Sequence, residues 1–186
     1  MEQTKIKSDF LPYGRQNIYD DDIEAVVKVL KSDWLTQGPT IELFEEKLKH
    51  QLNSEFVVAC ANGTAALHLT MMALGLNKDD TVLTTPITFI ASANCARFVG
   101  ASVKFVDVDY DTALISYEKL EEAIFADKNK NIKAVVPVHF TGLPVDLPKI
   151  YQLCQNNEIA VVDDCCHALG AWFEHDNKKY LIGGNK

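Results

Sequence analysis

The segment VVDDCCHALG, residues 161–170, places two carboxylates, two thiols and an imidazole at the end of an apolar run. Such a set could bind a metal, form a redox pair, or present polar groups to a ligand at the end of a buried strand. On a strand, neighbouring side chains point to opposite faces, so Asp163 and Asp164 do not form a paired acid and base. For the same reason, Cys165 and Cys166 do not readily chelate one metal. Because the sequence also lacks any CxxC spacing, we expect no structural metal site.

Asp164 and His167 are the pair of interest in this segment. A carboxylate at a buried strand end needs a cationic or hydrogen-bonding partner to remain charged. His167 could supply that partner, which would make the pair structural. A protonated pyridine nitrogen of a ligand would serve as well, and these two residues alone leave both interpretations open.

A second candidate site is the segment ANGTAALHL, residues 61–69. Asn62 and Gly63 form a tight turn and Thr64 opens a helix, so backbone amides at a positive helix end could bind a phosphate. A glycine turn followed by a threonine N-cap would explain the same residues. The segment is neither a Walker A motif nor the GxGxxG of dinucleotide folds.

The segment TPITFIASAN, residues 85–94, places Phe89 at a junction between a strand and a helix. A flat aromatic ring there could stack on a planar ligand or simply pack within the loop. A phosphate turn, an aromatic residue and a strand-end carboxylate on successive α/β units together fit pyridoxal 5′-phosphate. His139 is interpreted as structural, and no Ser-His-Asp set or GxSxG elbow occurs.

Strands and helices must position these residues. Along the chain, segments with the hydrophobic pattern of a strand alternate with segments that have the pattern of a helix. Strand-like runs occupy 56–61, 81–86, 102–108, 133–140 and 159–165, and helix-like segments occupy 20–30, 39–52, 64–74, 90–99, 116–126 and 147–156. The strands are nearly continuous Val-rich runs, typical of a sheet covered on both faces. We therefore expect an α/β fold with a mostly parallel sheet, helices on both faces and a hairpin near residues 171–184.

Composition limits the class of protein. The chain has 186 residues, of which 47% are hydrophobic and 24% charged, and this suits a globular protein with one sizeable core. The net charge of −8 argues against nucleic acid or an anionic membrane as partner. The N-terminus lacks the apolar core of a signal peptide, so we expect a cytoplasmic protein.

Four segments, NGTAALHL, TPITFIASAN, VHFTGLPVDL and VVDDCCHALGA, resemble the successive motifs of the DegT/DnrJ/EryC1/StrS aminotransferases. These are fold-type-I pyridoxal-phosphate enzymes that act mostly on nucleotide-linked keto-sugars. The opening LPYGRQNIYDDDIEAVVKVLKSDWLTQGPTIELFEEKL is similar to the branch of the pseudaminic-acid pathway. That branch aminates C4 of a UDP-linked 4-keto-6-deoxy-N-acetylhexosamine, and glutamate is the usual amino donor of the family.

The resemblance implies a role for each matching residue. Backbone and hydroxyl groups of the turn, Gly63, Thr64 and Ala65, would hold the cofactor phosphate. Phe89 would stack on the pyridine ring, Asp164 would pair with its nitrogen, and His167 would lie beside the phenolic oxygen. The resemblance also implies residues that line the sugar-nucleotide pocket, namely Tyr13, Trp34, Leu35 and Thr36.

The resemblance also implies that residues 1–186 are the N-terminal part of a longer protein. The Schiff-base lysine of the family lies in an S-F-H-x-x-K motif, which would follow residue 186. Residues 1–55 would form a helical segment contributing to the substrate pocket, and residues 56–186 a partial cofactor-binding domain. The family implies a homodimer for the full protein.

The implied topology makes one structural prediction. The strands at 81–86, 102–108, 133–140 and 159–165 should form one contiguous sheet, while 56–61 should lack both of its neighbours. Direct pairing of 56–61 with 159–165 would contradict it.

Alternatives remain on sequence grounds. A dehydratase of the same family would carry histidine in place of the cofactor-binding lysine. A non-catalytic protein that binds the cofactor or a nucleotide-sugar is the alternative from another class. A Rossmann-type nucleotide binder is disfavoured because its glycine fingerprint is missing.

Overall fold

The structure, a computed structural model, describes residues 15–184. Its backbone contacts divide the chain into two units, residues 1–43 and 44–186. The first unit holds helix α1 (Asp20–Leu30), whose three N-terminal aspartates suit the positive end of a helix. Helix α2 (Pro39–Leu52) begins at a proline, which the first turn tolerates, and runs into the second unit. No helix among residues 15–184 combines the length and apolar character needed to cross a membrane.

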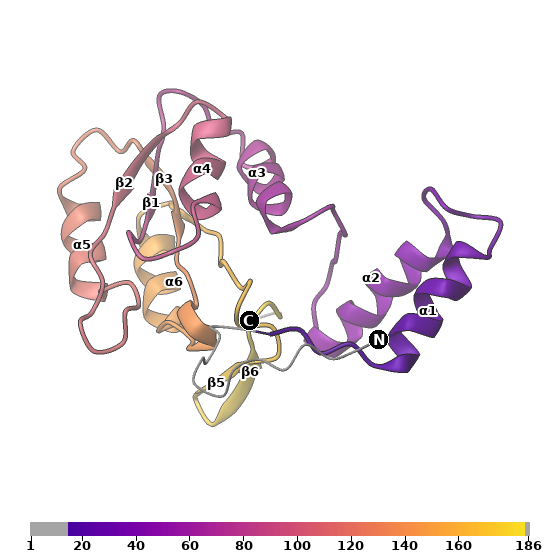
Figure 1. Cartoon of the computed structure of the whole chain (residues 1–186). Helices are drawn as coiled ribbons and strands as arrows, with labels where there is room; N and C mark the ends of the chain where they lie inside the picture. The colour runs from indigo at the N-terminus through magenta and orange to yellow at the C-terminus, as the bar shows by residue number, and fades with distance from the viewer. Residues whose placement is uncertain (1–14, 185–186) are drawn as a thin grey trace, which may run out of the picture. The chain divides into compact units, whose positions relative to one another are not determined.

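The second unit is built on a parallel sheet of order β2-β1-β3-β4 (Figure 1). Its strands are β1 (Thr81–Thr84), β2 (Ser102–Phe105), β3 (Ile132–Val136) and β4 (Ala160–Val161). The prediction of one contiguous sheet from these four segments is therefore confirmed. Each observed strand is shorter than its predicted run, and the last residues of each run lie outside the ladder.

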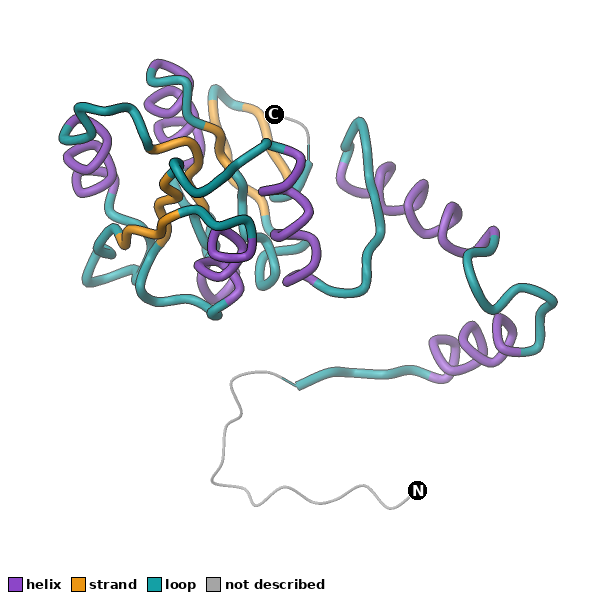
Figure 2. The backbone as a smooth tube through the Cα atoms, turned by 90° about the horizontal axis from the view of Figure 1, so that it is seen from above, coloured by secondary structure: helices purple, strands orange, loops and turns teal. Residues whose placement is uncertain are grey.

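Four helices cover the sheet, two on each face, as predicted (Figure 2). They are α3 (Gly63–Ala73), α4 (Ala91–Phe98), α5 (Tyr117–Phe125) and α6 (Leu147–Asn156). Alternation along the strands separates two hydrophobic clusters. Leu83 and Val135 pack with α5 and α6, whereas Val82, Ala134 and Val136 pack with α3 and α4. A single 3₁₀ turn, η1 (Phe140–Gly142), follows β3.

The predicted hairpin near the C-terminus is present as β5 (Trp172–His175) and β6 (Lys178–Leu181). Its two turn residues, Asp176 and Asn177, both have positive φ, of 50° and 58°. Aspartate and asparagine tolerate this conformation best among residues with a side chain, and tight hairpin turns require it. The buried side chain of Ile182 joins the hairpin to the cluster of α5 and α6.

Residues 56–61 do not form a strand, which corrects the sequence prediction for this run. Phe56 and Val58 are 78% and 82% exposed, and the sheet contains no strand from this segment. An apolar run becomes a strand only where a neighbour accepts and donates its backbone hydrogen bonds, and none of the described strands lies beside it. The run is unpaired, as the topological prediction required.

Candidate cofactor site

A cavity of about 230 Å³ lies at the carboxyl ends of the parallel strands, where open α/β sheets bind ligands. It is lined by Gly63, Thr64, Leu67, Thr88, Phe89, Ala91, Val138, Phe140, Asp164, Cys166 and His167. Five of the six residues predicted to bind the cofactor are in this set, although they come from three separate segments. The sixth, Ala65, is not.

The start of α3 forms one wall of the cavity. The side chain of Asn62 caps the helix, with Oδ1 accepting the amide hydrogen of Ala65 at 2.9 Å. Gly63 and Thr64 precede that amide in the first turn, whose N–H groups have no acceptor within a helix. The amides of Gly63 and Thr64 can therefore face an anion, whereas that of Ala65 is engaged by the cap.

Gly63 lies close to the segment that follows β4. A Cβ atom at this position would lie 3.0 Å from Sγ of Cys166, closer than side-chain carbons normally approach a neighbour. Glycine therefore keeps the turn open at the point where a phosphate would approach the helix. Partial burial, together with the nearby carboxylate of Asp164, raises the pKa of the Cys166 thiol to about 11. The thiol is therefore neutral at physiological pH.

Asp164 is held at the end of β4 by backbone and side-chain hydrogen bonds. Its N–H donates to the carbonyl of Pro137 at 2.9 Å, and its carbonyl accepts from the N–H of His139 at 3.2 Å. Its carboxylate accepts from the Ser92 hydroxyl at 2.7 Å and from the Cys166 amide at 3.2 Å. With 6% of its surface exposed, the residue presents a fixed and nearly buried carboxylate to the cavity.

Two ring-bearing residues complete the cavity wall. Phe89 lies in the loop between β1 and α4 and is 70% exposed, so most of its ring is available to a ligand. His167, three residues after Asp164, lies in a turn beside Phe140, with ring centroids 6.4 Å apart. The exposed aromatic surface of Phe89 in the wall of this cavity fits stacking on a flat ligand.

These features together suit a phosphorylated pyridine. A helix N-terminus with a glycine binds a dianionic phosphate, and a buried carboxylate stabilises a protonated ring nitrogen. The cavity walls supply both groups together with an exposed aromatic ring. The residues present therefore fit pyridoxal phosphate.

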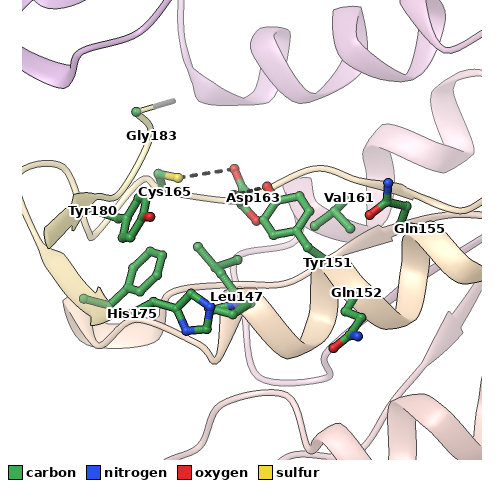
Figure 3. Close-up of a pocket in the computed structure, with 13 residues that line it drawn as sticks. Leu147, Tyr151, Gln152, Gln155, Val161, Asp163, Cys165, His175, Tyr180 and Gly183 are labelled. Atoms are coloured by element: carbon green, nitrogen blue, oxygen red, sulfur yellow. Dashed lines mark hydrogen bonds between the residues drawn. The ribbon is translucent and has the colours of Figure 1, made fainter. Parts of the chain in front are cut away.

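A larger cavity of about 760 Å³ lies on the other side of the β4 end, where Asp163 points (Figure 3). The hydroxyl of Tyr151 donates to Oδ2 of Asp163 at 2.9 Å, and the thiol of Cys165 donates to its carbonyl oxygen. Burial and the charge of Asp163 raise the pKa of Tyr151 far above its usual value, so the phenol stays a donor. The two aspartates thus serve different sides of the strand, as alternation predicts.

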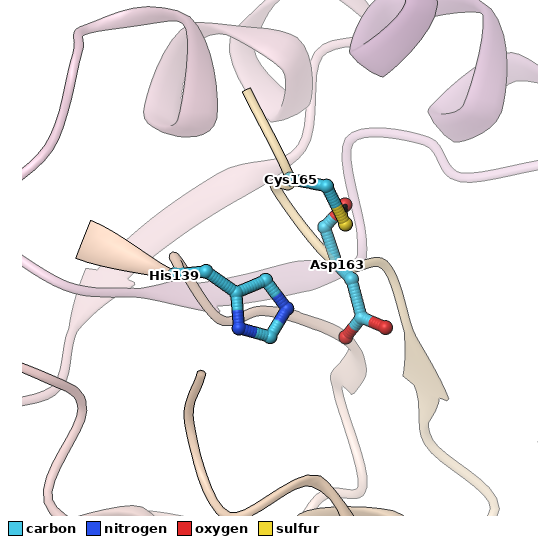
Figure 4. A group of neighbouring side chains, drawn as sticks. All are labelled: His139, Asp163 and Cys165. Atoms are coloured by element: carbon cyan, nitrogen blue, oxygen red, sulfur yellow. Dashed lines mark hydrogen bonds between the residues drawn. The ribbon is translucent and has the colours of Figure 1, made fainter. Parts of the chain in front are cut away.

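Sequence reasoning did not find that Asp163 and Cys165 lie beside His139, with one ligand-type atom of each within 4.8 Å of the others (Figure 4). His139 follows a different strand, and only the parallel pairing of β3 with β4 brings it there. Nδ1 of His139 accepts the Val145 amide hydrogen at 3.2 Å, so this ring nitrogen is engaged by the backbone of the chain.

The residues predicted to bind the substrate are not among those that line the cavity. Trp34, Leu35 and Thr36 belong to the first unit and are exposed, and Trp34 and Leu35 are 64% and 67% exposed. Tyr13 falls outside the described residues. A role for these four residues in substrate binding stays a prediction.

Several solved structures similar to this chain are named as aminotransferases. Spr1654 of Streptococcus pneumoniae, named as a sugar aminotransferase and solved in its PMP form, has a TM-score of 0.79 and 28% identity over 87% of this chain and 43% of its own. A DegT DnrJ EryC1 StrS aminotransferase from Brucella abortus has a TM-score of 0.77 and 34% identity over 80% of this chain and 40% of its own.

Sequence comparison extends this likeness along most of the chain. The protein MJ1066 of Methanocaldococcus jannaschii is 38% identical over 174 residues, which are 94% of this chain and 44% of that protein. The chain therefore spans less than half the length of the curated relative it matches. The DegT/DnrJ/EryC1/StrS aminotransferase family model matches residues 16–181, so the chain belongs to this family.

Proposed function

We propose that this chain carries the cofactor pocket of a pyridoxal-phosphate-dependent aminotransferase that acts on a nucleotide-linked keto-sugar. The observation that supports it best is the cavity that joins a glycine-opened helix start at Gly63 with the nearly buried carboxylate of Asp164. Spr1654, which is similar over most of the chain, has been solved in both PLP and PMP forms.

In this proposal five of the residues that line the cavity each have a task. The amides of Gly63 and Thr64, with the Thr64 hydroxyl, hold the phosphate. Phe89 covers one face of the ring, and His167 lies beside the phenolic oxygen. Asp164 keeps the pyridine nitrogen protonated, and the bound cofactor then supplies an electron sink for the transfer of an amino group.

A lysine is needed to bind the cofactor covalently and to move protons between the two half-reactions. The residues that line the cavity in the described part of the chain include no lysine. The chain covers 43% of the Spr1654 structure. We therefore place the reactive lysine in a part of the protein beyond residue 186.

For the substrate we propose a UDP-linked 4-keto-6-deoxy-N-acetylhexosamine, aminated at C4 with glutamate as donor, on the route to pseudaminic acid. The similarity of the opening segment to that branch supports it, and so do the names of Spr1654 and CalS13 of Micromonospora echinospora as sugar aminotransferases. Tyr13, Trp34, Leu35 and Thr36 would contact the sugar nucleotide. We place the full protein in the cytoplasm as a homodimer.

Two alternatives share the cofactor pocket. A sugar dehydratase of the same family would use histidine at the position of the reactive lysine. A cofactor-binding protein without catalysis would have neither residue. The residue at that downstream position distinguishes the three.

The test of the pocket is the binding of pyridoxamine 5′-phosphate, which needs no covalent lysine. We expect Asp164→Asn to weaken binding by about tenfold or more, since it removes the charge that faces the ring nitrogen. Asp163→Asn is the matched control, because this neighbouring carboxylate points to the other side of the strand, and it should bind like the unmodified chain. Equal affinities for the Asp164→Asn variant and the unmodified chain, measured by fluorescence titration, would refute the assignment of Asp164.

A further inference from the structure

The carboxylate of Asp164 is itself held by a buried hydroxyl on another element. Ser92 lies in the first turn of α4 and has no exposed surface. Its Oγ lies 2.7 Å from Oδ2 of Asp164, 72 residues away in the sequence. The same Oγ lies 2.7 Å from Oγ1 of Thr88 and 3.2 Å from the carbonyl oxygen of Phe89.

The direction of these hydrogen bonds follows from the proton count. A serine hydroxyl has one proton, and an ionised carboxylate only accepts. The short contact with Asp164 is therefore a bond in which Ser92 donates, and a charged acceptor makes it stronger than one to the carbonyl of Phe89. Since that proton is used, the contact with Thr88 is a bond in which Thr88 donates to Ser92.

A directed chain of hydrogen bonds thus runs from Thr88 through Ser92 to Asp164. It begins in the loop that carries Phe89 and ends at the carboxylate. The amide of Cys166 donates to the other carboxylate oxygen, Oδ1. With at least one donor on each oxygen, the plane of the carboxylate is fixed before any ligand binds.

We propose that Ser92 is a positioning residue that aims the Asp164 carboxylate at the ring nitrogen of a pyridine cofactor. This inference rests on the proposed function, because it assigns Ser92 a task only if such a ring occupies the cavity. A fixed carboxylate loses no rotational freedom when the ligand binds, so it favours the protonated ring more than a mobile one would. The hydrogen bond from Thr88 to Ser92 also links the loop that carries Phe89 to Asp164.

The test compares three variants for binding of pyridoxamine 5′-phosphate labelled with ¹⁵N in its ring. Ser92→Ala removes the donor with little change of volume, and Ser92→Thr retains a hydroxyl. Cys95→Ala is the matched control, because Cys95 is buried on the same helix and its thiol donates to the Ser92 carbonyl oxygen rather than to the carboxylate. Thermal unfolding by circular dichroism establishes that each variant is folded.

We expect Ser92→Ala to weaken binding by about three- to tenfold and to lower the pH at which the ring nitrogen of the bound ligand loses its proton by about half a unit to one unit. Ser92→Thr should recover most of this shift in the ¹⁵N titration, and Cys95→Ala should leave it unchanged. A purely structural serine would lower the melting temperature without moving the ¹⁵N titration.

The outcomes separate the two proposals. If the unmodified chain binds with a protonated ring nitrogen and Ser92→Ala behaves identically, the role of Ser92 is wrong and the pocket assignment stands. Equal shifts in Ser92→Ala and Cys95→Ala would also overturn it, since they would indicate general loosening of α4. If the unmodified chain does not bind the ligand, the proposed function fails, and the role of Ser92 fails with it.

Discussion

Gly63 and Cys166 come from distant segments, and their close approach sets what the phosphate turn tolerates. Gly63→Ala would place a methyl group 3.0 Å from Sγ of Cys166. Overpacking of this kind costs about 1–3 kcal/mol, so we expect a lower free energy of unfolding and weaker binding of pyridoxamine phosphate. Chemical denaturation and ligand titration measure the two effects.

The partner variant Cys166→Ala identifies the cause. It removes the atom that the new methyl group would meet, so the double variant Gly63→Ala/Cys166→Ala should recover most of the lost stability. Additive losses in the double variant would show that the glycine is needed for another reason.

At the scale of single residues, strand alternation is sufficient to separate Asp164 from Asp163, and the structure places the two side chains at different cavities. The role given to Asp164 rests on the resemblance to the family. The sequence places Asn62 in the turn and offers Thr64 as the N-cap of the helix. In the structure Asn62 is the N-cap, and its side chain accepts the amide hydrogen of Ala65. The cluster of His139 with Asp163 depends on the register between two strands, which a single sequence does not contain.

At the scale of elements, the cap of α3 connects stability to the site. Asn62→Ala removes the acceptor for the Ala65 amide and should lower the free energy of unfolding by about 1 kcal/mol. It should also weaken the binding of pyridoxamine phosphate, because the first turn that faces the phosphate frays. Both quantities can be measured on the same protein sample.

Ser116→Ala is the matched control for this variant. Ser116 caps α5 through the amide of Lys119, and α5 covers the face of the sheet opposite to α3. Ser116→Ala should lower the free energy of unfolding by a similar amount without changing the affinity for pyridoxamine phosphate. If both cap variants weaken binding equally, the effect comes from global stability rather than from the start of α3.

Hydrophobic periodicity and capping residues predict most of the helices and strands. The helices at 39–52 and 147–156 match the observed bounds, since Pro39 and Asp146 mark their starts. The prediction of a strand at 56–61 is wrong. The apolar composition of this run fits the pattern of a strand whether or not a neighbouring strand is available. Burial and pairing decide such runs, and both are properties of the fold rather than of the local sequence.

At the scale of the whole molecule, the sheet and the cofactor cavity belong to one unit. Every residue of both hydrophobic clusters, and every residue that lines the cavity, lies between Gly63 and Ile182. The described part of the first unit, residues 15–43, supplies none of them. Among its apolar residues, Ile23, Val26 and Leu30 are exposed and belong to neither hydrophobic cluster.

We therefore expect removal of residues 1–38, which keeps all of α2, to leave the second unit folded. The shortened chain should unfold cooperatively, with a melting temperature within a few degrees of the longer chain, because neither hydrophobic cluster loses a member. Its affinity for pyridoxamine phosphate should be unchanged, whereas binding of a UDP-sugar should be lost if Trp34, Leu35 and Thr36 contact it. A shortened chain that fails to unfold cooperatively would show that the first unit stabilises the sheet, and the division of the protein into a cofactor unit and a substrate segment would then be wrong.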